Sequence, residues 1–303
     1  LGILERFPKS APWPRSLHAD MVDLLSAADA KAIGYDVTFA ETSTSPEDAV
    51  LAKAIADSGR VVLASEAVLR RSDSDIPVAS ERMLPIESLR VGAAGFGVTT
   101  LVPDRDGVVR RVPVTIRQDG VEEKTFALHL LERSGASRPE IVLEDGLYRV
   151  PFVGPPGSFR TVSFVDVKNS TVSAETFRDK IVLVGATAAD LHDEYLTPFS
   201  YGRFTPGVEI QANVFQGLME GKSLRLFPLL WTAGLYAILC ALATLFLMRL
   251  RLRWAIPSAF ALALGYLIVT LVLSTNGFLA PVLYPFVILI GVLLSGLVPK
   301  SAV

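Results

Sequence analysis

Three long hydrophobic runs constrain the architecture of this chain more than any other feature of its sequence. They cover residues 226–248, 254–273 and 278–298, and none of them contains an acidic residue. An α-helix needs about 20 apolar residues to cross the ~30 Å hydrocarbon core of a bilayer. The runs therefore predict an all-α membrane domain of three spanning helices within residues 225–303, in preference to buried helices of a large soluble protein.

The short links between the runs predict the orientation of this domain. Arg249, Arg251 and Arg253 crowd the first link, whereas the second link, residues 274–277, carries no charge. An excess of Arg in a short loop marks the cytoplasmic side of a membrane protein. We therefore expect residues 1–224 to be extracytoplasmic and the C-terminus to be cytoplasmic. Such an outer domain also needs delivery across the membrane, so we expect a spanning segment or signal upstream.

The composition of the outer part restricts its partners and its covalent chemistry. Five of the 29 basic residues and none of the 31 acidic residues follow residue 224, which leaves 24 basic and 31 acidic residues before it, a net charge of −7. A mildly acidic domain lacks the concentrated basic face that nucleic acid requires, so we expect no nucleic-acid partner. The only cysteine, Cys240, lies in the first hydrophobic run. The outer domain therefore has no internal disulfide, and its length is sufficient for a stable core without one.

The start of the outer domain predicts an α/β fold. Apolar residues recur at helical spacing over 17–28, and residues 31–39 form a strand pattern. A second helix is predicted from Ser45, as its capping residue, to Gly59, and a second apolar strand over 60–65. Alternating helices and strands favour parallel pairing with right-handed crossovers.

The middle of the outer domain is less regular. Residues 66–90 carry no clear pattern and are expected to form a long surface excursion. A hairpin is predicted between residues 91–99 and 108–117, because turn-forming residues occupy 103–107. A second hairpin is predicted over 140–153.

The end of the outer domain predicts one more strand and the helix that leads to the membrane. Residues 180–184 are fully apolar after Lys180, which indicates a fully buried central strand. A polar loop, residues 187–205, follows it, and residues 206–221 then have the pattern of an amphipathic helix. We therefore predict an extracytoplasmic mixed sheet flanked by helices, followed by the membrane domain.

No arrangement of residues in this sequence predicts catalysis or a metal centre. A GxSxG serine motif is absent, and no cysteine nucleophile occurs outside the membrane runs. His18, His129 and His192 do not have metal-ligand spacing, so a solvated loop is favoured over a metal site at His192. We expect no catalytic site, metal or cofactor in these residues.

Six short segments in residues 10–224 carry a family resemblance. They are 13–15 (WPR), 34–41 (GYDVTFAE), 106–113 (DGVVRRVP), 180–185 (KIVLVG), 193–198 (DEYLTP) and 206–213 (PGVEIQAN). Together they resemble the type 2 CHASE domain, an extracytoplasmic sensory module of bacterial signalling receptors. Three membrane helices directly after the domain are also typical of that family.

The resemblance implies a receptor in the bacterial inner membrane, with one more spanning helix before the sensor. Its output would be a cytoplasmic adenylate or guanylate cyclase, or a protein kinase, that lies outside these residues and alone would need a divalent metal. Because such cyclases work as dimers, a homodimer is expected, with close helix contacts at Ala233, Gly234 and Ala237 or at Gly291 and Ser295. The expected partners are thus membrane lipid, a second copy of the chain, and an extracytoplasmic small-molecule or protein signal.

A place for that signal to bind follows from the rule that open α/β sheets bind ligands beyond the carboxyl ends of their parallel strands. Acidic and polar residues follow each of the three predicted strands, and the predicted first hairpin brings an arginine near them. The expected ligand site consists of Asp36, Glu41, Glu66, Arg110, Thr187 and Asp193. The structural alternative is that Asp36 and Asp193 only cap helices or accept hydrogen bonds from loop amides.

Two other classes of protein fit the sequence less well. A periplasmic enzyme tethered to the membrane could use Asp36, Glu41 or Asp193 as acid or base, but a single anchor helix would suffice for it. A transporter is disfavoured because no ionisable residue lies inside a predicted span.

Overall fold

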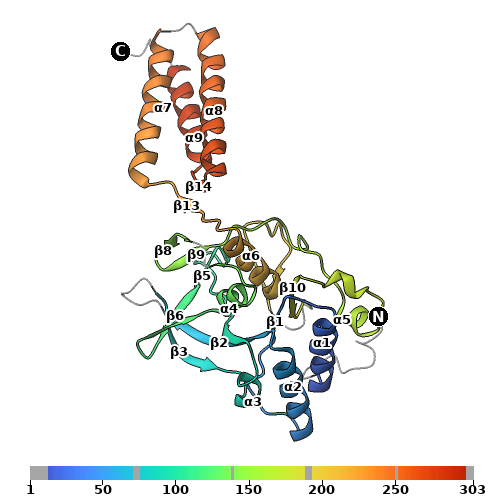
Figure 1. The fold of residues 1–303 in the computed structure, drawn as a ribbon. Coiled ribbons are helices and arrows are strands. Elements are labelled where there is room, and N and C mark those ends of the chain that lie inside the picture. The colour runs from blue at the N-terminus through green and yellow to red at the C-terminus, as the bar shows by residue number, and fades with distance from the viewer. Residues whose placement is uncertain (1–12, 71–75, 138–139, 188–192, 250–251, 298–303) are drawn as a thin grey trace. The chain divides into compact units, whose positions relative to one another are not determined.

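The computed structural model describes residues 13–70, 76–137, 140–187, 193–249 and 252–297. The chain divides into two compact units, Leu1–Ser223 and Leu224–Val303. The first unit is α/β and the second is helical (Figure 1).

A seven-stranded mixed sheet forms the centre of the first unit. The strand order is β10-β1-β2-β3-β6-β7, and β4 pairs with β2 beside this path. The strands are β1 (Ala32–Asp36), β2 (Val61–Arg70), β3 (Val78–Met83), β4 (Gly95–Val98), β6 (Thr115–Gln118), β7 (Val121–Lys124) and β10 (Ile181–Gly185). The predicted mixed sheet is confirmed.

Strand β2 joins a parallel half of the sheet to a mixed half, in which β3 pairs parallel with β6 and β6 pairs antiparallel with β7. On the parallel side β1 lies between β10 and β2, with Ala32 opposite Ile181, and residues 62–65 of β2 pair with β4. Residues 66–70 of β2 continue beyond this region and pair antiparallel with β3. The four strands β10, β1, β2 and β4 therefore end at one common carboxyl edge.

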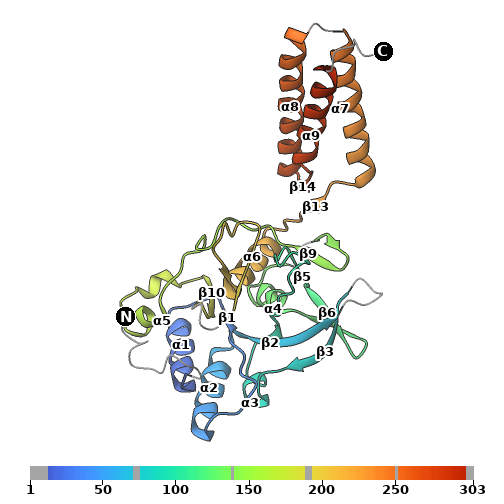
Figure 2. The ribbon, with the colours of Figure 1, turned by 180° about the vertical axis from the view of Figure 1, so that it is seen from behind.

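Helices cover both faces of the parallel half. They are α1 (Arg15–Ala27), α2 (Ser45–Ser58), α3 (Glu87–Arg90), α4 (Phe126–Arg133), α5 (Phe164–Lys168), the short 3₁₀ helix η1 (Ala174–Thr176) and α6 (Gly207–Met219). Because side chains alternate along a strand, Ile33 and Leu63 join a core with α1 and α2, whereas Ala32 and Val62 join a second core with α4 and α6. Figures 1 and 2 show these two helix pairs on opposite sides of β1 and β2.

Short strands complete the first unit. A three-stranded sheet contains β5 (Arg111–Val112), β9 (Leu147–Arg149) and β8 (Leu143–Glu144), and a two-stranded one contains β11 (Glu194–Tyr195) and β12 (Thr205–Pro206). The antiparallel pair of β8 and β9 confirms the hairpin predicted over 140–153.

The hairpin predicted between residues 91–99 and 108–117 is wrong. The turn itself forms, since the amide of Gly107 donates to the carbonyl of Asp104 at 2.8 Å. The flanking segments nevertheless find other partners: β4 pairs with β2, and β5 pairs with β9. Gly97 favours this arrangement, because a Cβ there would lie 2.5 Å from the amide nitrogen of Phe126, so only glycine lets α4 approach the strand this closely.

Three further predictions need correction. Residues 180–184 do not form a central strand: β10 pairs only with β1 among the described residues and lies at the edge of the sheet. The residues of β10 are apolar because both faces of the strand are covered: Leu183 packs into one core and Val182 into the other. An apolar run therefore indicates that both faces are buried, and does not indicate a central position in the sheet. Residues 66–90 contain the second half of β2 together with β3 and α3. The N-cap position of α2 is Thr44, one residue before the predicted Ser45, and its side chain forms no capping hydrogen bond.

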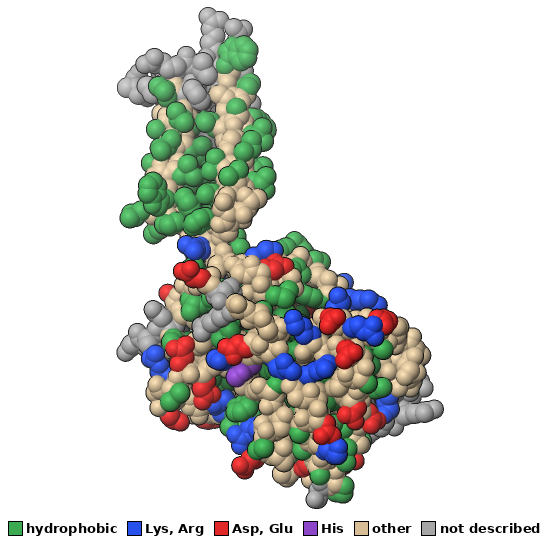
Figure 3. Space-filling model, in the orientation of Figure 1, with side chains coloured by type: hydrophobic (Ala, Val, Ile, Leu, Met, Phe, Trp, Pro, Cys, Tyr) green, Lys and Arg blue, Asp and Glu red, His purple; other side chains and the backbone are tan. Residues whose placement is uncertain are grey.

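The second unit contains three helices. They are α7 (Leu229–Arg249), α8 (Leu252–Thr275) and α9 (Leu283–Leu297), and the strands β13 (Arg225–Leu226) and β14 (Phe278–Leu279) pair within the same unit. In the described part of the chain, one helix, Pro257–Thr275, is long and apolar enough to cross a membrane, and Leu229–Leu245 is a shorter apolar helix. Hydrophobic side chains predominate over this unit in Figure 3, whereas most charged side chains lie on the α/β unit.

Candidate functional site

Polar residues gather where the parallel strands end. Asp36 is the last residue of β1, Thr99 follows β4, and Glu66 follows the parallel part of β2. Ala32 and Val62 face the core that contains α4 and α6. Asp36 lies four positions after Ala32, and Glu66 lies four positions after Val62. Because side chains alternate along a strand, Asp36 and Glu66 point to that same face of the sheet.

The fourth member of this group, Asp193, is fixed to the first turn of α6. The amide of Gly207 donates to the backbone carbonyl of Asp193 at 2.9 Å, and β11 pairs with β12 immediately before the helix. The Asp193 carboxylate lies against Gly207 so closely that a Cβ on this residue would collide with it. A carboxylate at a helix N-terminus is favoured by the helix dipole and by the free amides there.

The carboxyl groups are close enough to change one another's proton affinity. The pKa of Asp36 is raised to about 7, mainly by burial and next by the negative charge of Asp193, while a hydrogen bond with Thr99 opposes the rise and Glu66 adds a smaller increase. Burial also raises the pKa of Asp193, and a hydrogen bond with Tyr195 opposes this rise. Near neutral pH the group therefore exchanges a proton at Asp36.

Neighbouring hydroxyl and amide groups hold these carboxyl groups in place. The hydroxyl of Thr38 donates to Glu66 Oε1 at 2.7 Å. Burial, then the charge of Asp193, raises the pKa of Tyr195 to about 12, so this phenol remains a hydrogen-bond donor to Asp193. On α6, Gln211 Nε2 donates to the Thr99 carbonyl at 2.8 Å. We refer to Asp36, Glu66, Thr99, Asp193 and Tyr195 as the carboxyl-edge cluster.

Of the six residues predicted for the site, the structure brings three together. Asp36, Glu66 and Asp193 interact electrostatically, as described above. Glu41 and Thr187 are exposed. Arg110 donates to Asp106 at 2.8 and 2.9 Å and lies 3.4 Å from Asp104.

Arg110 is thus held within its own turn, because the hairpin that was expected to bring it to the other residues does not form. Within the described ranges, none of the three clustered carboxylates forms an ion pair with Lys, Arg or His. The cluster is consequently an uncompensated acidic group. It can hold a proton or accept hydrogen bonds from a ligand with ammonium or hydroxyl groups.

Sequence reasoning missed the residues that hold the cluster in place. Thr99 would have followed from the same rule as Asp36 if residues 91–99 had been assigned to a parallel strand. Thr38, Tyr195 and Gln211 carry no sequence signal, because their roles depend on contacts across the fold. In the part of the chain that the structure describes, no three His, Cys, Asp or Glu side chains are placed to hold a metal ion, and His192 lies outside that part.

Comparison with known protein families gives a match over most of the chain. The family model described as CHASE2 domain matches residues 3–248, which include the α/β unit and nearly all of α7. No curated protein and no solved structure matches the chain.

Proposed function

Because this chain belongs to the CHASE2 family of extracytoplasmic sensory domains of signalling receptors, we propose that it is the sensory and membrane part of a bacterial receptor with a cytoplasmic adenylate or guanylate cyclase as its output. The cyclase is proposed from the motif resemblance, and a protein kinase is the alternative output. The extracytoplasmic signal then acts on residues 1–224, and the response is produced beyond the membrane.

The proposed topology has three spans in the bacterial inner membrane, over residues 226–248, 254–273 and 278–298, with a cytoplasmic C-terminus. The arginine-rich first link favours this orientation. Exposed apolar side chains on α7 and α8 favour a lipid environment: Leu230, Trp231 and Phe260 are 87%, 72% and 75% exposed. A homodimer is proposed because cyclases of this type work in pairs.

We propose that the signal enters at the carboxyl-edge cluster. The observation that carries this proposal is the position of Asp193, whose carboxylate and carbonyl both lie on the first turn of α6. Gln211 ties the same helix to the end of β4. A ligand or proton that changes the cluster therefore acts on α6, and the chain continues from α6 at Met219 to the helical unit at Leu224. A differential affinity of ~1.4 kcal/mol for two states of the cluster would change their ratio tenfold.

Replacing Asp193 in the full-length receptor tests this proposal. Asp193→Ala removes the carboxylate that contacts α6, so cyclic-nucleotide output should change while expression and melting temperature stay those of the wild type. Asp166→Ala, at an exposed residue of α5, is the matched control and should leave output unchanged.

Normal output in Asp193→Ala, or unfolding of both Asp193→Ala and Asp193→Asn, would mean that the residue is structural and that the signal enters elsewhere. Formation of a product when the purified chain is incubated with a metabolite panel would favour the membrane-tethered enzyme instead, with Asp36 as its acid or base. A monomer at every concentration in nanodiscs would count against the dimer.

A further inference from the structure

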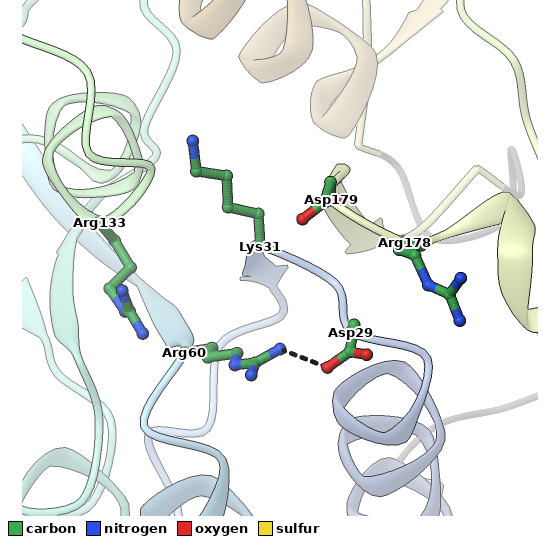
Figure 4. Close-up of a pocket in the computed structure, with 6 residues that line it drawn as sticks. All are labelled: Asp29, Lys31, Arg60, Arg133, Arg178 and Asp179. Atoms are coloured by element: carbon green, nitrogen blue, oxygen red, sulfur yellow. Dashed lines mark ion pairs between the residues drawn. The ribbon is translucent and has the colours of Figure 1, made fainter.

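A cavity lies at the opposite, amino-terminal edge of the parallel sheet (Figure 4). Its volume is about 380 Å³, which is within the range of small-ligand sites. Six charged residues line it, namely Asp29, Lys31, Arg60, Arg133, Arg178 and Asp179. We refer to these residues as the amino-edge pocket.

The fold brings the lining residues together from four distant segments. Lys31 precedes β1, Arg60 precedes β2, Asp179 precedes β10, and Arg133 ends α4. Backbone hydrogen bonds hold two of these segments side by side: the amide of Asp179 donates to the carbonyl of Asp29 at 3.0 Å, and the amide of Lys31 donates to the carbonyl of Lys180 at 2.8 Å. The pocket is therefore built from the starts of three strands and the end of α4, and does not depend on a single loop.

The charges of the amino-edge pocket do not balance. Four cationic and two anionic side chains give the lining a formal charge of +2. Of the two lining aspartates, Asp29 pairs with a lining cation, at 3.8 Å from Arg60 Nη1. Arg178 pairs outside the lining, with Glu175 at 2.8 Å.

Several donors of the pocket have no acceptor among the residues that the structure describes. Arg60 Nη1 donates to the carbonyl of Ala30 at 2.8 Å, and Arg133 Nε donates to the carbonyl of Gly59 at 3.0 Å. These bonds orient both guanidinium groups and leave the terminal nitrogens of Arg133 without a partner among the described residues. The Lys31 ammonium likewise has no hydrogen-bond or ion-pair partner within the described ranges. In Figure 4, the Arg133 side chain points downward on the left of the pocket, whereas the Lys31 side chain extends upward, away from the Arg60–Asp29 pair.

We propose that the amino-edge pocket binds a small organic dianion, a phosphate monoester or a dicarboxylate that also carries hydroxyl or amino groups. The fork of a guanidinium group matches the oxygens of a phosphate or carboxylate, and an ammonium group supplies a point charge for a second anionic oxygen. Two negative charges neutralise the lining. Asp29 and Asp179 then accept hydrogen bonds from the hydroxyl or amino groups. This site is separate from the carboxyl-edge cluster, and the proposal does not depend on the proposed function.

Calorimetric titration of the whole chain in nanodiscs of zwitterionic lipid tests the proposal, with inorganic phosphate and succinate as probes and chloride at matched ionic strength as the reference. At least one probe should bind saturably. Lys31→Met and Arg133→Met should each weaken that binding at least tenfold, because each removes a donor that has no acceptor in the described part of the chain. Lys53→Met, at an exposed residue of α2, should bind as the wild type does. Binding of phosphate alone would identify a phosphate ester, and binding of succinate alone a dicarboxylate.

A second measurement does not depend on the folding of variants. In the wild-type chain, a saturating probe should protect Lys31 from an amine-acetylating reagent and leave the modification of Lys53 unchanged. The proposal is wrong if neither probe binds saturably, if chloride competes equally at the same ionic strength, or if Lys31→Met and Arg133→Met bind like the wild type. Equal acetylation of Lys31 with and without probe would also overturn it, and would mean that Arg60 and Arg133 only serve the backbone carbonyls of Ala30 and Gly59.

Discussion

Replacing Asp36 with Asn should remove a pH-dependent loss of stability from the α/β unit. The pKa of Asp36 rises from its ordinary value of 3.8 to about 7 in the folded protein, first because of burial and second because of Asp193. Between these two values the folded state binds a proton that the unfolded state has released. The free energy of unfolding therefore falls as the pH rises through this window, with a slope of about 1.36 kcal/mol per pH unit.

The magnitude expected between pH 5 and pH 7 is roughly 2–3 kcal/mol. His18 acts in the opposite direction, because burial and then the charge of Arg15 lower its pKa from 6.5 to about 4. The stability that neutral His18 contributes is fully present above pH 6.5 and is lost as the pH falls toward 4. The wild-type profile combines both effects, so the difference between Asp36→Asn and the wild type isolates the effect of Asp36.

Trp13 provides the assay. Its ring packs edge-on against Phe164, with centroids 5.3 Å apart, so its fluorescence reports the packing of the α/β unit. With Trp231→Phe and Trp254→Phe as the background, urea unfolding is followed at pH 5 and pH 7. The free energy of unfolding of Asp36→Asn, relative to that of the wild type, should be roughly 2–3 kcal/mol higher at pH 7 than at pH 5.

Two further variants test the cause of the shift. Asp23→Asn, at an exposed residue of α1, should show the same difference from the wild type at both pH values. Asp193→Asn removes a negative charge that raises the pKa of Asp36 in the folded state. The pH range over which the free energy of unfolding falls should therefore end at a lower pH than in the wild type. If Asp36→Asn differs from the wild type by the same amount at pH 5 and pH 7, the carboxyl group titrates alike in both states and the reasoning fails.

Two other predictions concern packing and topology. Gly97→Ala would place a Cβ 2.5 Å from the amide nitrogen of Phe126, and the backbone there cannot move aside as a flexible side chain can. Thermal unfolding should therefore show that the free energy of unfolding falls by about 2 kcal/mol or more. An unchanged melting temperature would mean that α4 does not approach β4 this closely. In a Cys240→Ser background, Asn276→Cys should react with an impermeant maleimide in intact cells and Leu252→Cys should not, and reversed labelling would place the acidic domain in the cytoplasm.

Elements with a strong local pattern were predicted well from the sequence. The helices α1, α2 and α6 and the pair of β8 and β9 lie close to where the periodicity and turn residues indicated. Strand pairing was predicted poorly, because it depends on distant partners. The turn at Gly107 forms, but the segments on either side of it do not pair with each other. The apolar run of β10 indicated that both faces of the strand are covered, but not that the strand lies at the edge of the sheet.

The candidate site followed the same division. Asp36, Glu66 and Asp193 were brought to one edge by a rule that needs only the direction of parallel strands. Arg110 was expected there only because of the hairpin that does not form. The amino-edge pocket was not predicted, because Lys31, Arg60 and Arg133 each look like an ordinary surface cation in the sequence and become a group only when three strands and α4 are aligned.

The pairing of β1 with β10 also sets the order in which the sensory unit can mature. Ala32 lies opposite Ile181, so one side of β1 has no partner until almost the whole unit has been synthesised. Pairing between such distant segments is slow, and an open strand edge is prone to aggregation and proteolysis while it waits. The α/β unit therefore folds late in its own synthesis, and its yield in a cell depends on how well the nascent chain is protected until β10 has docked.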